Sequence, residues 1–97
     1  MLNNPLLEGY LTDFRGGFEY WKTAPAQERY TIAKKLKNIA FDICFVLGRP
    51  KEAPANVLTT IDNLFCAAAD VLRRCEDQRI KDIATHLAQR AEKLMTD

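Results

Sequence analysis

Three cysteines and one histidine are the residues of this chain from which a metal site, or a nucleophile with its base, could be built. A zinc site needs about four Cys or His ligands in clustered spacing, whereas Cys44, Cys66 and Cys75 stand far apart and form no CxxC pair. None of the three carries a local signature that would place a thiolate in a cleft. The sequence therefore predicts neither a metal site nor catalysis by a cysteine.

His86 stands four residues after Asp82 and four before Arg90, a spacing typical of a solvated helix face. The glycines fit neither the dinucleotide-binding pattern nor the P-loop pattern. The Glu-x-x-His pattern of di-metal bundles is also absent, because Ile83 stands three residues before His86. Asp42 interrupts an apolar run but lies on its polar side, which predicts an exposed or ion-paired carboxylate. We therefore expect no enzyme activity and no cofactor.

Length, composition and charge describe one small domain over residues 1–97. The residues are 47% hydrophobic and 28% charged, which suffices for a core and a soluble surface. Fourteen basic and thirteen acidic side chains leave a formal charge of +1, so no global field favours nucleic acid. An odd number of cysteines in apolar stretches predicts free thiols in a reducing cytoplasm. The chain shows neither a signal-peptide pattern nor an apolar stretch of spanning length, so no membrane association is expected.

Apolar residues recur three and four positions apart along most of the chain, which predicts an all-α fold. The predicted helices span about residues 5–22, 25–47, 54–74 and 77–95. Asn4 before Pro5 suits the start of the first helix, and Asp77 suits the start of the fourth. The pair Gly16-Gly17 falls inside the first helix, which predicts a kink or a close approach by another element there. Similar lengths and mostly short connections predict a four-helix up-down bundle.

The second predicted helix carries aromatic residues on the side away from its main apolar seam. Tyr30, Phe41 and Phe45 fall within an arc of about 60°, and Lys34 and Lys37 lie beside them. Covering a Phe instead of leaving it in water is worth roughly 1.5–3 kcal/mol, so this aromatic side is expected to contact something.

Two kinds of cover are compatible with the pattern. One is intramolecular, from the first helix with its Tyr10 and Tyr20. The other is a second copy of the chain or a different protein, because aromatic residues ringed by lysines are typical of contact surfaces.

These patterns favour a non-enzymatic interaction protein that forms a homodimer, binds another protein and acts as an inhibitor, adaptor, chaperone or regulator. The protein-binding residues predicted are Tyr30, Lys34, Lys37, Phe41 and Phe45. The alternative is a nucleic-acid-binding regulator that uses a local excess of basic residues at positions 29–51. That patch comprises Arg29, Lys34, Lys35, Lys37, Arg49 and Lys51.

Overall fold

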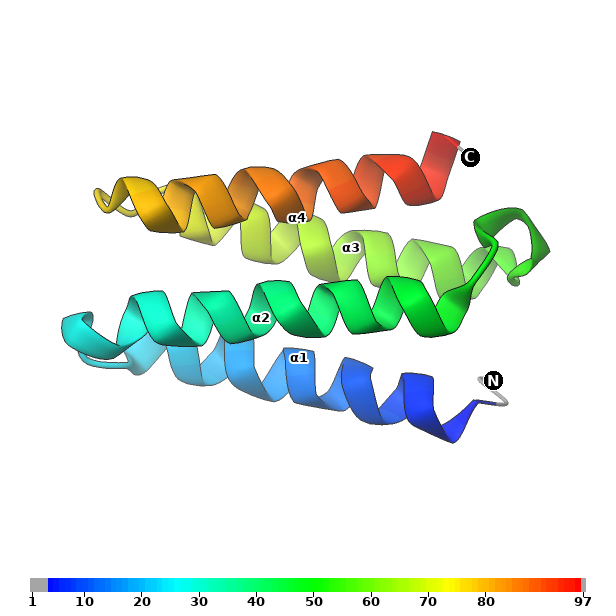
Figure 1. Cartoon of the computed structure of the whole chain (residues 1–97), viewed down its shortest axis with the longest axis horizontal. Helices are drawn as coiled ribbons and strands as arrows, with labels where there is room; N and C mark the ends of the chain where they lie inside the picture. The colour runs from blue at the N-terminus through cyan, green and yellow to red at the C-terminus, as the bar shows by residue number, and fades with distance from the viewer. Residues whose placement is uncertain (1–3, 97) are drawn as a thin grey trace.

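The protein forms four α-helices, and no strand occurs among residues 4–96, the part of the chain that this computed structural model describes (Figure 1). The elements are α1 (Pro5–Thr23), α2 (Ala26–Leu47), the short 3-10 helix η1 (Pro50–Glu52), α3 (Ala55–Leu72) and α4 (Gln78–Thr96). The prediction of an all-α four-helix bundle is confirmed. The ends of the predicted domain, residues 1–3 and 97, lie outside the described part.

The helix ends follow from their capping residues. The Asn4 side chain accepts hydrogen bonds from the backbone amides of Leu6 and Leu7, at 3.1 and 3.2 Å, as expected of an N-cap. Asp77 does the same for α4, accepting from the amide of Arg79 at 2.9 Å. The third helix ends at Leu72, two residues before the predicted end, because the following residues form a tight turn.

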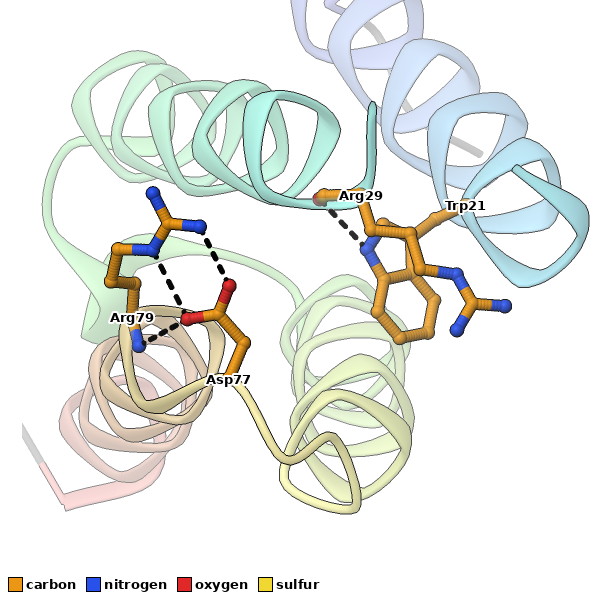
Figure 2. A network of polar contacts seen from close by, with 4 residues as sticks. All are labelled: Trp21, Arg29, Asp77 and Arg79. Carbon is orange, nitrogen blue, oxygen red and sulfur yellow. Dashed lines mark hydrogen bonds and ion pairs between the residues drawn. The ribbon is translucent and has the colours of Figure 1, made fainter. Parts of the chain in front are cut away.

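Consecutive helices run in opposite directions, but the order around the bundle is not the chain order. The hairpins α1–α2 and α3–α4 pack against each other with α2 beside α4 and α1 beside α3. Viewed along the bundle in Figure 2, α2 and α3 stand at opposite corners. The connection of residues 48–54 therefore crosses the end of the bundle diagonally, and the neighbours α2 and α4 run in the same direction (Figure 1).

One apolar face of every helix contributes to a single core. On α2 the buried residues are Ile32, Ala33, Leu36, Ala40 and Ile43. The rings of Phe14 and Phe65 join α1 to α3, with their centres 5.4 Å apart. Ile39, Val46 and Leu47 of the same helix pack against this core but are only partly buried.

Truncating the centre of the α2 core face should unfold much of the population. Leu36 and Ile43 are 1% and 0% exposed, so replacing either with Ala should lower the free energy of unfolding by about 2–5 kcal/mol. Chemical denaturation measures this loss. A cost below about 1 kcal/mol for both variants would contradict the assignment of these residues to a tightly packed core.

The glycine pair in α1 leaves the helix unbroken, and its two members have different surroundings. A Cβ on Gly17 would lie 3.0 Å from Cδ2 of Leu36, which is itself buried. A Cβ on Gly16 would meet nothing within 4 Å. Of the two sequence-based expectations, the structure shows the close approach, and it occurs at Gly17.

The pair supplies a matched test of that packing. Gly16→Ala should raise the free energy of unfolding by up to about 1 kcal/mol, because alanine favours the helix and the added methyl group is unobstructed. Gly17→Ala should be less stable than Gly16→Ala by about 1 kcal/mol or more, because its methyl group presses on Leu36. Equal gains for the two variants in thermal melts would show that α1 and α2 are not in tight contact here.

Candidate functional site

The α2 residues predicted to bind a partner lie on the side of α2 that borders α4. The Cζ atom of Arg79 lies 4.0 Å from the ring centre of Tyr30, and that of Arg90 lies 4.2 Å from the ring centre of Phe41. Helical spacing puts His86 and Lys93 on the same side of α4 as these arginines. We call this shared surface the α2–α4 face. It comprises Tyr30, Lys34, Lys37, Phe41, Phe45, Arg79, His86, Arg90 and Lys93.

Exposure increases along the face toward the C-terminal end of α2. Tyr30 is partly buried against the core, Phe41 is 40% exposed and Phe45 is 87% exposed. The cover that Tyr30 and Phe41 receive comes from arginines of α4. Tyr20 is itself 51% exposed, so the suggested cover by α1 through Tyr10 and Tyr20 is not what the structure forms.

The sequence pattern did not predict that Arg79 and Arg90 belong to this surface, although their spacing carried a relevant signal. Arg79 and Arg90 are separated by eleven residues, as are Tyr30 and Phe41. Equal spacing lets both pairs meet when the two helices are neighbours, and the parallel direction of the helices pairs Tyr30 with Arg79 and Phe41 with Arg90. Nothing in the sequence pattern singled out α2 and α4 as such a pair.

At the N-terminal end of the face, an ion pair holds the stacked arginine (Figure 2). Nη2 of Arg79 donates to Oδ2 of Asp77 at 2.8 Å, and Nε donates to Oδ1 at 3.1 Å. These bonds hold the pKa of the Asp77 carboxyl below its ordinary value. Asp77 thus caps α4 and holds the guanidinium that covers Tyr30. The cation at this end of the face therefore already has its ion-pair partner within the chain.

At the other end, the stacked arginine has no such partner. Among residues 4–96, no carboxylate oxygen lies within the 4.0 Å ion-pair distance of Arg90, and the same holds for Lys34, Lys37 and Lys93. Beside Arg90 the surface is hollowed into a recess of about 230 Å³. The recess is lined by Cys44, Gly48, Pro50, Arg90, Lys93 and Leu94.

A larger recess, of about 650 Å³, opens at the end of the bundle where the two hairpin turns meet. Figure 2 shows its Trp21, whose indole N–H donates to the carbonyl oxygen of Arg29 at 3.0 Å. The guanidinium of Arg29 lies 4.9 Å from the Trp21 ring centre and donates to the carbonyl oxygen of Lys22 at 3.2 Å. These contacts stabilise the turn between α1 and α2, so Arg29 has a structural function at this end of the bundle.

The basic residues of the alternative, nucleic-acid-binding reading are spread over the molecule. Arg29 is engaged at the bundle end, and Lys35 lines a recess between α1 and α2. Arg49 lies 3.7 Å from Glu52, and Lys51 lies in η1, both in the diagonal connection. Of the six residues, the structure brings Lys34 and Lys37 together on the α2–α4 face, and the other four lie elsewhere.

The remaining chemistry-bearing side chains do not gather into a cluster. His86 and Asp42 are exposed, as the sequence pattern predicted. Cys44 and Cys75 are partly buried, whereas Cys66 is exposed on α3 although it lies in an apolar stretch of the sequence. Within residues 4–96, no group of three His, Cys, Asp or Glu side chains could hold a metal ion.

The pKa of each cysteine thiol lies above the ordinary value of 9.0, chiefly because burial disfavours the thiolate. Arg90 partly opposes this rise at Cys44, and Asp62 adds to it at Cys66. All three groups are therefore protonated thiols at neutral pH, and the thiolate needed for nucleophilic attack is scarce.

Alkylation kinetics test these thiols. Labelling with iodoacetamide, followed by mass spectrometry, should be slow at pH 7 and should still accelerate as the pH rises past 9.0, since deprotonation lies above that value. Exposed Cys66 should react before Cys44. A thiol with a rate already at its plateau at pH 7 would show a reactive thiolate and reopen the question of cysteine catalysis.

Comparisons of the chain with models of protein families, with curated proteins and with solved structures found no match. None of the helices in the described part is long and apolar enough to cross a membrane.

Proposed function

We propose that this protein is a non-enzymatic interaction protein that binds another protein through the α2–α4 face. The observation that carries the proposal is the exposure of Phe45, 87%, beside Phe41 and its stacked arginine. Covering a Phe is worth roughly 1.5–3 kcal/mol, so a partner that buries this ring gains binding energy. Aromatic and arginine side chains are the residue types that dominate binding energy at protein interfaces.

In this proposal the protein works in the cytoplasm as an inhibitor, adaptor, chaperone or regulator of its partner. The free thiols Cys44, Cys66 and Cys75 support a reducing compartment. The partner is either a second copy of this chain or a different protein. In both cases the bound surface includes Phe41 and Phe45.

Substituting the exposed aromatic should separate binding from folding. Phe45→Ala should leave the melting temperature close to that of the wild type, because the ring makes little contact within the chain, but should weaken partner capture by about tenfold or more. Pull-down with quantitative mass spectrometry measures capture, and light scattering measures self-association.

Tyr20→Ala is the matched control, because it removes another exposed aromatic, on α1. It should capture the same partner as the wild type. Two results would count against the proposal: identical capture and oligomeric state for wild type and Phe45→Ala, or a fall in stability for Phe45→Ala as large as that for Leu36→Ala.

A further inference from the structure

On the α2–α4 face, an arginine of α4 stacks on an aromatic ring of α2 at two places. A carboxylate holds the arginine at one of them. In both, an arginine of α4 covers an aromatic ring of α2, at 4.0 Å for Arg79 and 4.2 Å for Arg90. Arg79 is also held by the carboxylate of Asp77 at 2.8 Å. Arg90 has no acidic partner among the described residues. The missing component is therefore a carboxylate at Arg90.

We propose that the α2–α4 face binds an acidic amphipathic helix of a partner protein. A carboxylate of that helix pairs with Arg90 as Asp77 pairs with Arg79, and its apolar side chains cover Phe45. The inference deepens the proposed function and rests on it, because it specifies the chemistry of the partner at the same face.

The charge of the face calls for an acidic occupant. Lys34, Lys37, Arg90 and Lys93 have no ion-pair partner among the described residues. Within residues 4–96, the nearby acidic groups lie outside ion-pair distance of these four cations. Asp82 accepts a hydrogen bond from Gln78 at 3.0 Å, and Asp42 lies about 100° around α2 from Phe41, on the far side from α4. A guanidinium stacked on a ring still presents its N–H groups to a carboxylate.

The shape of the face suits a helix. Side chains from Lys34 to Phe45 extend for about 17 Å, the length of roughly three helical turns. The recess of about 230 Å³ beside Arg90 has room for one side chain, between the apolar Leu94 and the charged Lys93. An amphipathic helix meets such a surface with apolar anchors three, four and seven residues apart.

A second copy of the chain is a poorer occupant. A symmetric dimer places the same surface on both sides, so Arg90 and Lys93 of one copy would face the cations of the other. Juxtaposed like charges oppose association. The whole chain carries a formal charge of only +1, which gives no general attraction that would replace specific contacts.

Nucleic acid is also disfavoured, on a different ground. Single-stranded nucleic acid binds basic grooves through rings on which successive bases stack. Here the Arg79 and Arg90 guanidinium groups already occupy ring faces of Tyr30 and Phe41. Phe45 alone among the aromatic residues of the α2–α4 face carries no stacked cation.

Selection from a displayed library of random 16-residue peptides tests the chemistry of the occupant directly. Peptides are selected on the wild-type protein and depleted on Phe45→Ala, which keeps those that depend on the face. Enriched sequences should combine several Asp or Glu residues with apolar residues three or four apart. Their affinity should fall by about tenfold or more on Arg90→Glu and on Lys93→Glu.

Arg15→Glu is the matched control, because Arg15 is exposed at the opposite seam, between α1 and α3. It carries the same charge change and should leave peptide affinity unaltered. A peptide in which only the acidic residue that pairs with Arg90 is replaced by Lys should bind Arg90→Glu more tightly than it binds the wild type. A purely structural function of Arg90 would not produce this rescue, and Lys93→Glu keeps the test valid if Arg90→Glu fails to fold.

Four outcomes would overturn the inference. Enrichment of neutral or basic peptides that still require Phe45 would reject the acidic partner while leaving protein binding intact. A dimer in light scattering that Phe45→Ala dissolves would make the occupant a second copy. Binding of a single-stranded oligonucleotide that Arg90→Glu abolishes would make it nucleic acid. Failure to enrich any peptide dependent on Phe45 would reject this use of the face, and unchanged pull-down by Phe45→Ala would then reject the proposed function as well.

Discussion

The parallel contact between α2 and α4 is the constraint on which the rest of the structure depends. Each hairpin leaves an apolar seam that it cannot bury alone, so the two hairpins stack into one core. The diagonal connection lets α2 lie beside α4 and not beside its successor α3 (Figures 1 and 2). The two helices run in the same direction, and the two aromatic residues of α2 and the two arginines of α4 are each eleven residues apart. Each aromatic ring therefore meets one arginine, in the same order along both helices. Both arginine–aromatic stacks are consequences of this register.

Parallel neighbours also bring the like ends of two helix dipoles together. Asp77 lies at the N-terminal end of α4 and Glu28 in the first turn of α2, where negative charge is favourable. Arg90 and Lys93 lie near the C-terminal ends, and α2 has no basic residue in its own last turn. Each helix C-terminus carries about half a unit of negative charge, so the two C-termini together offset about half of two full positive charges. The same cations therefore help to stabilise the parallel pair, and their positive charge exceeds the negative charge of the two helix ends.

On α2, the residues that hold the fold and those proposed to bind lie on different sides. Leu36 and Ile43 face the core, and Phe41 and Phe45 face α4 and solvent. Helical geometry separates the two sets by more than a quarter turn, so the α2–α4 face can change without altering the core. Gly17 adds to this arrangement, because it lets α1 approach Leu36 closely from the other side of the helix.

The sequence by itself determined the helices, because apolar spacing, the Asn4 and Asp77 caps and the prolines act through neighbouring residues. It also located the aromatic side of α2, since Tyr30, Phe41 and Phe45 share one face of any helix. Tertiary structure decided which helix borders that side, and therefore that arginines of α4, and not tyrosines of α1, cover it. It also decided that Arg79 has an acidic partner and that Arg90 has none within residues 4–96. These outcomes depend on how two hairpins stack, a choice between packings of similar apolar faces that no local pattern in the chain encodes.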